Sequence, residues 1–203
     1  MPKIVDHDQR RAELADAALD IIAKDGIKAL TLRAVAEAAG WSTGVVNHYF
    51  SSHHDLLVGA LRRAAETQGR MFKQLRHDAS LTPLERLGQL IESVLPLDDR
   101  RIAMTRIFLV FYAEAAGNPA AREEIVDYLA NWRRVVRRVV AECQEAGQVP
   151  ADADTTKLAA ELVALSDGLA MHAMLDEQVL EGVTADGHIT LQLAGESWRL
   201  AAR

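Results

Sequence analysis

The stretch Thr31–Phe50, TLRAVAEAAGWSTGVVNHYF, decides the fold of the N-terminal part of this chain. It divides into two short amphipathic segments of helical character, joined by a three-residue link that contains Gly40. Thr31 and Ser42 are residue types that cap helix N-termini, and glycine adopts a positive φ at a turn at little cost. Two short helices with this link predict a helix-turn-helix, which places its second helix in the major groove of DNA.

The second segment of this motif predicts the surface that reads DNA. Gly44 has no side chain, so the helix can sit deep in the groove, and Asn47 can form paired hydrogen bonds with an adenine edge. The free amides at the start of the same segment suit a phosphate. The predicted DNA-binding residues are Arg33, Ser42, Thr43, Gly44, Asn47, His48, Tyr49 and His53.

Residues around the motif are expected to support it in two ways. Four apolar side chains face inward and fix the crossing angle of the two helices, and three basic residues form a mobile arm. The inward set is Val35, Ala39, Trp41 and Val46, and the arm is Lys3, Arg10 and Arg11.

Apolar periodicity elsewhere predicts helices almost throughout the chain. The expected fold class is all-α, with about nine helices and no strand. Beyond the motif, the expected helices cover about 52–77, 82–96, 100–116, 119–147, 154–176 and 185–201.

Charge and composition limit the possible functions. The 203 residues carry a net charge of −6, which argues against nucleic acid as a partner at first sight. Residues 1–80, however, hold 11 Lys and Arg against 10 Asp and Glu, so the acidity belongs to the C-terminal part. No apolar stretch is long enough for a membrane span or typical of a secretory signal. Cys143 is the only cysteine, which fits a cytoplasmic protein without disulfides.

The motif also carries a family resemblance. The residues Thr31-Leu32-Arg33, Ala36, Ala39-Gly40, Ser42, Gly44 and His48-Tyr49-Phe50, followed by Asp55-Leu56-Leu57, resemble the N-terminal signature of TetR-family transcriptional regulators, most closely the BetI-like branch. The resemblance implies an all-helical homodimer, with a helix-turn-helix domain in residues 1–51 and an effector-binding and dimerisation domain in residues 52–203. This chain departs from the family at His53, where Lys is usual, and at Asn47, where Tyr is frequent.

The family layout implies an effector pocket among the later helices. Aromatic residues there can surround a quaternary ammonium through cation–π contacts, although aromatic and Met side chains at helical spacing are also typical of an ordinary core. The candidate pocket residues are Phe72, Met104, Ile107, Phe108, Phe111, Tyr112, Trp132, Met171 and His172.

The last two expected helices combine small and large apolar residues, which favours a four-helix dimer interface over a hairpin packed only on its own core. A two-fold dimer is also what a palindromic operator requires. The candidate interface residues are Leu162, Leu169, Ala173, Leu191 and Trp198.

Two other groups of residues are interpreted as surface. The pairs Arg133-Arg134 and Arg137-Arg138 fit a solvated helix face neutralised by Asp and Glu neighbours better than a DNA contact. His53 and His54 are adjacent on a helix, so they point apart and no metal site is expected.

The sequence therefore predicts a ligand-responsive repressor that is not an enzyme. It is expected to bind a double-stranded DNA operator as a homodimer, to release it when a small-molecule effector binds, and to need no cofactor, metal or membrane. Two alternatives stay open, a small helical enzyme or metabolite-binding protein and a dimeric adaptor that does not read DNA.

Overall fold

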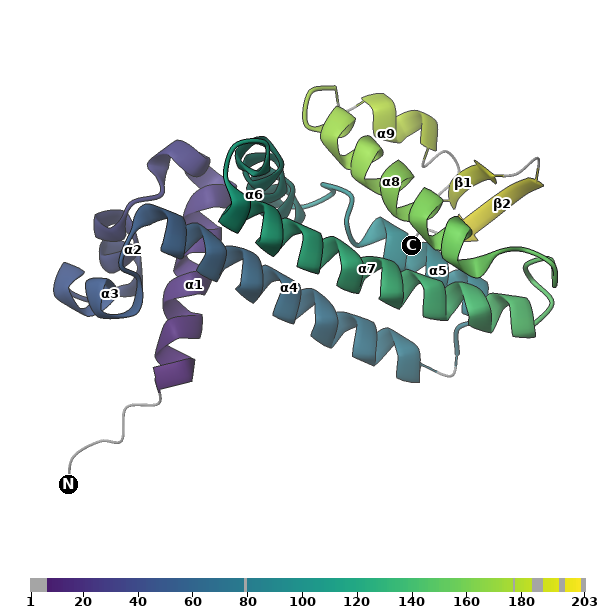
Figure 1. Ribbon diagram of the computed structural model, residues 1–203, viewed down its shortest axis with the longest axis horizontal. Helices are drawn as coiled ribbons and strands as arrows, with labels where there is room; N and C mark the ends of the chain where they lie inside the picture. Colours follow the sequence, from purple (N-terminus) through teal and green to yellow (C-terminus); the bar gives the residue numbers. More distant parts are fainter. Residues whose placement is uncertain (1–6, 79, 177, 184–187, 194–195, 202–203) are drawn as a thin grey trace. The chain divides into compact units, whose positions relative to one another are not determined.

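The computed structural model describes residues 7–201, apart from 79, 177, 184–187 and 194–195; at 76–77, 182–183 and within 188–201 only the backbone is described. Within these residues the chain forms nine α-helices, a short 3-10 helix (η1) and two strands (Figure 1). In order they are α1 (His7–Asp25), η1 (Ile27–Ala29), α2 (Leu32–Ala39), α3 (Thr43–Tyr49), α4 (His53–His77), α5 (Pro83–Glu92), α6 (Asp99–Ala115), α7 (Pro119–Glu145), α8 (Thr155–Ala173), α9 (Gln178–Val183), β1 (His188–Leu193) and β2 (Glu196–Ala201).

The chain packs as two compact units. Unit 1 comprises Met1–Gln68 and Leu97–Arg122, and unit 2 comprises Gly69–Pro96 and Glu123–Arg203. The long helices α4 and α7 each contribute to both units. Packing therefore does not divide at the expected 51/52 boundary, which stays a prediction about where DNA-binding and effector functions separate.

The core of unit 1 joins the N-terminal helices to α6. Leu14, Ala18 and Ile22 form an apolar stripe on α1, and each is fully buried. The stripe packs against α2 and α6, and Ile107 and Phe111 of α6 are also fully buried. Because α1 contacts both partners, it links α6 to the helix-turn-helix.

The core of unit 2 lies among α5, α7 and α8. Thr82 begins α5 with a capping box that includes Glu85, and Pro83 occupies the first helical position. Cys143 is buried, as expected for a core thiol. Burial and the nearby Glu142 raise its pKa to about 12, so the thiol stays protonated. The fully buried residues at the centre of this core are Leu87, Leu95, Val136, Val140, Cys143, Ala159 and Leu162.

The all-α prediction describes the chain up to α9, but the expected helix over 185–201 is wrong. Within this range, the described residues His188–Leu193 and Glu196–Ala201 form two antiparallel strands, in which Leu191 pairs with Trp198 and Leu193 with Glu196. Ile189, Leu191 and Leu193 alternate with polar residues, and this period of two is the strand signal that a helical interpretation overlooks. Strand β2 lies against α5, so the hairpin belongs to unit 2.

Candidate nucleic-acid interface

The turn between α2 and α3 is built by local hydrogen bonds. Thr31 caps α2 by accepting from the Ala34 amide at 3.0 Å, and Ser42 caps α3 by accepting from the Val45 amide at 3.4 Å. Gly40 ends α2 with a φ of 71°, a conformation that favours glycine. The Trp41 amide then donates to the Ala36 carbonyl at 2.8 Å. The predicted helix-turn-helix is therefore present, with both caps in place.

Buried side chains on and around α3, the recognition helix, fix its position. Val35 and Val46 are fully buried, as predicted, and so is Phe50, which follows α3. Phe50 packs against α4 at Gly59, where a Cβ atom would overlap the phenyl ring. Gly59 was not predicted, because only the packing of α4 on Phe50 reveals its role.

The predicted DNA-binding residues remain accessible. Ser42, Thr43, Gly44, Asn47 and His48 are exposed along α3 and its cap, and Tyr49 is half-buried. Arg33 in the first turn of α2 and His53 at the start of α4 are also exposed. The local structure thus leaves polar groups from three consecutive helices available for DNA.

Tyr49 contacts two residues of α1. The Arg11 guanidinium donates to the Tyr49 carbonyl at 2.8 Å and lies 3.4 Å from the Asp55 carboxylate. The Tyr49 hydroxyl lies 3.2 Å from Nδ1 of His7, and the Ser51 amide donates to Asp55 at 2.9 Å. These contacts join α1, the end of α3 and the start of α4.

Three expectations around the motif need correction or lie outside the described residues. Trp41 does not face inward: it is 39% exposed, and the Arg10 guanidinium lies 3.6 Å from the centroid of its ring. Arg10 and Arg11 are not part of a mobile arm, since both lie in α1 and contact the motif. Lys3 lies outside the described residues.

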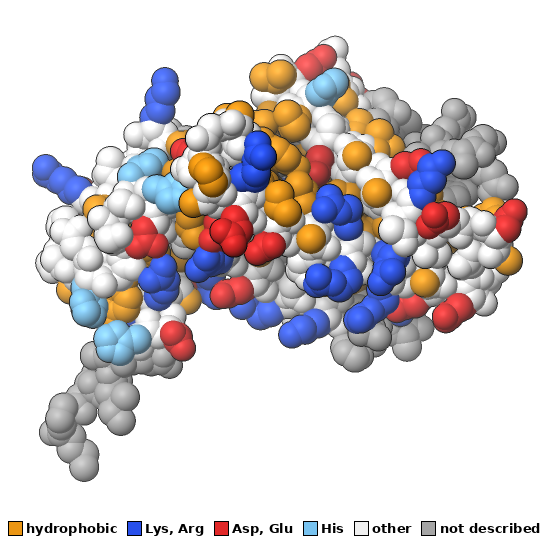
Figure 2. Space-filling model, viewed as in Figure 1, with side chains coloured by type: hydrophobic (Ala, Val, Ile, Leu, Met, Phe, Trp, Pro, Cys, Tyr) orange, Lys and Arg blue, Asp and Glu red, His pale blue; other side chains and the backbone are white. Residues whose placement is uncertain are grey.

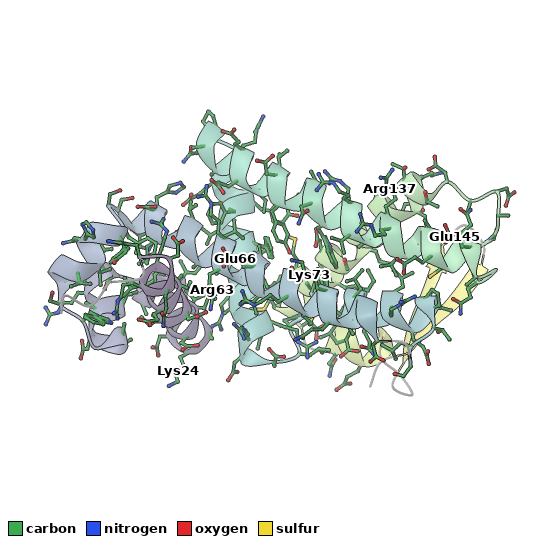
Figure 3. The ribbon with its side chains drawn as sticks, turned by 90° about the horizontal axis from the view of Figure 1, so that it is seen from below. Lys24, Arg63, Glu66, Lys73, Arg137 and Glu145 are labelled. Atoms are coloured by element: carbon green, nitrogen blue, oxygen red, sulfur yellow. The ribbon has the colours of Figure 1, made fainter. Side chains whose placement is uncertain are left out.

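Ion pairs and a helix-end contact hold α1 in unit 1. Arg63 of α4 forms two hydrogen bonds with Asp16, at 2.9 and 2.6 Å (Figure 3 shows Arg63 and Glu66 on α4). Arg106 of α6 donates to the carbonyls of Ile22 and Ala23 at 2.8 and 2.7 Å. A cation at a helix C-terminus interacts favourably with the helix dipole, so Arg106 ties α6 to the end of α1.

The candidate pocket residues are distributed over both units. In unit 1, Ile107 and Phe111 are fully buried, whereas Met104, Phe108 and Tyr112 are half-buried. In unit 2, the rings of Phe72 and Trp132 stack with centroids 5.0 Å apart. Trp132 is buried, and its Nε1 atom has no hydrogen-bond partner among the described residues.

Two candidate pocket residues prove to be on the surface of the subunit. Met171 is 40% exposed and His172 is exposed, because α8 buries its opposite side against the core of unit 2. For the same reason Leu162 and Ala173, expected at a dimer interface, are buried within one chain. Leu169 is half-buried, and the side chains of Leu191 and Trp198 lie outside the described residues.

A different stripe of α8 stays open. Ala160 and Ala164 are exposed, a Cβ atom added at Gly168 would meet nothing within 4 Å, and Leu175 just beyond the helix is 90% exposed. With Met171, these positions follow helical spacing and leave an apolar surface. Figure 2 shows hydrophobic side chains over this part of α8.

Comparison with known proteins agrees with this geometry. Residues 14–60 match the model described as bacterial regulatory proteins of the tetR family, and residues 83–194 match the model described as BetI-type transcriptional repressor, C-terminal. The chain belongs to the TetR family. The family consists of transcriptional regulators, so the protein is a DNA-binding regulator and the enzyme alternative is set aside. The part of the chain that the structure describes contains no helix able to cross a bilayer.

Relatives and solved structures extend over most of the chain. It is 31% identical over 176 residues to the HTH-type transcriptional regulator PksA of Bacillus subtilis, covering 87% of this chain and 84% of the relative. It is 32% identical to the regulator BetI of Rhizobium meliloti, covering 83% and 80%. Its fold matches that of a protein from Saccharomonospora viridis, described as a transcriptional regulator and solved in complex with choline, with a TM-score of 0.71 at 23% identity over 88% of this chain and 97% of that one.

Proposed function

We propose that this family member is a cytoplasmic repressor that binds a palindromic operator as a homodimer and leaves it when a small molecule binds its C-terminal part. The observation that carries the DNA-binding role is the capped, glycine-closed turn that leaves Thr43, Gly44 and Asn47 exposed on α3. The matches to TetR-family and BetI-type models support the regulatory role.

The proposed contacts divide into two kinds. Asn47 and Thr43 read base edges, Asn47 through paired hydrogen bonds to adenine and Thr43 through a thymine methyl group. The amides that follow Ser42, together with Arg33 and His53, contact phosphates and set the position of the motif. His48 and Tyr49 complete the surface at the end of α3.

Selection of bound fragments from sheared genomic DNA, followed by binding titrations on the fragment recovered, tests this proposal. The wild-type protein should select one palindromic site, and the double variant Thr43→Ala/Asn47→Ala should lose most of its preference for that site over unrelated duplex. Thr156→Ala, an exposed change in α8, is the matched control. A wild-type protein that binds no duplex sequence-specifically would favour the non-DNA-reading adaptor instead.

The open stripe of α8 is the proposed dimer surface. Small residues at Ala160, Ala164 and Gly168 allow two helices to approach closely, and Met171 and Leu175 supply apolar area. A two-fold axis through this stripe gives the symmetry that a palindrome requires. The stripe replaces the buried Leu162 and Ala173 as the part of α8 that contacts a partner.

The proposed effector contact in unit 2 is the Phe72–Trp132 pair. A buried indole N–H without a partner is costly, and a ligand that carries a hydrogen-bond acceptor would satisfy it. Choline is the first probe to test, because the S. viridis protein is solved with it and aromatic faces attract quaternary ammonium groups. The effector relieves repression only if it binds the DNA-free conformation more tightly than the DNA-bound one.

A thermal-shift titration with choline tests the effector contact. Choline should raise the Tm of the wild-type protein in proportion to the logarithm of its concentration. Trp132→Phe, which keeps the ring stack but removes the N–H, should weaken that response. If choline leaves the Tm of the wild-type protein unchanged, it is not the effector.

A further inference from the structure

The exposed face of α7 separates its charges into two blocks. Glu123 and Asp127 are exposed near the N-terminal end, and Arg134 and Arg137 are exposed beyond them. No ion pair joins any of these four side chains to another described residue, and Arg134 donates only to the neutral Asn131 amide oxygen, at 3.0 Å. The expectation that Asp and Glu neighbours neutralise the arginines is therefore wrong for this face.

This arrangement is unfavourable in an isolated helix. Glu123 and Asp127 are four residues apart, as are Arg134 and Arg138, and like charges at that spacing repel. Figure 2 shows Lys and Arg side chains grouped over the middle of α7, and Arg137 is labelled on its outer side in Figure 3. Both charge blocks would gain from an oppositely charged surface with the same spacing.

The same helix provides that surface when its direction is reversed. Glu123 and Arg137 lie seven residues on either side of Ala130, so each is about 10 Å from it along the axis and on the same side of the helix. Asp127 lies three residues before Ala130, and Arg134 lies four residues after it. Alanine at the midpoint leaves room for a second helix to approach.

We infer that this face of α7 binds the same face of a second copy of the chain, antiparallel, about a two-fold axis at Ala130. Glu123 then faces the partner's Arg137, and Asp127 faces the partner's Arg134. Because the axis is two-fold, each pair occurs twice. The partner is a second copy of the chain, because the acidic block of this face meets the basic block of the same face when the second helix runs in the opposite direction.

Apolar contacts agree with this alignment. Val126 is 49% exposed and offers apolar surface beside these charges. In the antiparallel pair, Val126 and the partner's Arg133 lie on the same side of the contact. Their positions along the helix axis differ by about one residue. The aliphatic stem of an arginine covers apolar surface while its guanidinium stays in water, so Arg133 contributes packing as well as charge.

The α7 contact is separate from the α8 stripe and does not depend on DNA binding. If both surfaces are used, two α8-linked dimers associate through α7 into an assembly of four chains. Two operator-bound dimers on neighbouring sites would then bind cooperatively.

The test compares the full-length protein with two charge-reversal variants by sedimentation. Arg134→Glu/Arg137→Glu makes the face acidic, and Glu123→Arg/Asp127→Arg makes it basic. Each variant alone should associate through α7 at least about tenfold more weakly than the wild-type protein at about 50 mM salt. An equimolar mixture of the two should associate again, because each acidic face meets a basic one.

Two controls define the outcome. Lys24→Glu/Lys28→Glu changes the net charge as much as the acidic variant does, but at exposed positions in unit 1, and should leave association unchanged. Far-ultraviolet circular dichroism checks that every variant is folded. The inference is overturned if both α7 variants sediment like the wild-type protein, if their mixture stays unassociated, or if the acidic variant loses only DNA affinity.

Discussion

His53 marks a position where a single side chain sets the strength of a proposed phosphate contact. It is exposed at the start of α4, at a position where the family resemblance implies Lys. A lysine is charged throughout the physiological pH range, whereas a neutral imidazole donates one weaker bond. His53→Lys should therefore tighten operator binding severalfold and increase the slope of log affinity against log salt by about 1. Anisotropy titrations at several salt concentrations measure both, and an unchanged slope would contradict the contact.

Gly59 is required by the packing of α4 on Phe50. A methyl group at this position overlaps the phenyl ring, which is itself fully buried. Gly59→Ala should lower the free energy of unfolding by about 1–3 kcal/mol, because the ring or α4 must move. Gly69→Ala is the matched control, since nothing lies within 4 Å of a Cβ atom there. Chemical denaturation gives both values, and equal stability of the two variants would count against the overlap.

At the scale of the element, α6 depends on its N-cap. Asp98 accepts from the Arg101 amide at 2.8 Å and from its guanidinium at 2.7 Å. Burial alone raises the pKa of Asp98, but the hydrogen bonds from Arg101 outweigh it, so the net pKa is lowered. The ionised cap therefore stabilises the fold above the ordinary pKa of 3.8, and this contribution is lost as the pH falls through the lower folded value.

Asp98→Ala should destabilise the protein by about 1 kcal/mol near neutral pH. The difference from the wild-type protein should shrink as the pH falls below 3.8 and level off once the pH is below the lowered folded pKa, where the carboxyl is protonated in the folded protein too. Denaturation at several pH values measures this, and Asp98→Asn, which keeps a capping oxygen, separates the cap from the charge. A constant difference down to low pH would mean that the charge contributes nothing.

The contact between α6 and α1 depends on one arginine. Arg106 supplies the cation for the last carbonyls of α1, and its two hydrogen bonds fix the register of α6 against that helix. Arg106→Met keeps the apolar stem but removes the donor, and should cost about 1–2 kcal/mol of stability. Hydrogen exchange should show faster opening at the C-terminal end of α1, whereas Arg106→Lys should restore part of the protection. Unchanged exchange in Arg106→Met would show that the bonds do not hold the helix.

At the scale of the whole molecule, the α8 stripe determines whether two subunits associate. Ala164→Glu places a charge in the middle of the proposed interface, where an unpaired carboxylate is costly to bury. The variant should lose the α8-linked dimer and bind a full operator far more weakly than the wild-type protein. Ala120→Glu, at another exposed alanine, is the control. Mass measurements in about 500 mM salt, which screens the α7 charges, isolate the α8 contact.

Local sequence signals predicted much of this molecule. The caps at Thr31 and Ser42, the glycine turn and the helices beyond residue 50 all follow from interactions within about four residues of each other. The expected helix over 185–201 fails because the apolar alternation of 189–193 has the period of a strand. The position of Trp41 differs from the expectation because its partner, Arg10, comes from a different helix.

The recognition helix, its caps and the family can therefore be inferred from local sequence, because these depend on short-range backbone geometry and on residue types at fixed spacing. Tertiary packing sets which side of α8 remains open, why position 59 must be glycine, and how Arg106 meets an α1 carbonyl 84 residues away. Those features arise when helices distant in sequence pack together. A helix's own periodicity shows that it has an apolar side, but not which neighbour covers that side.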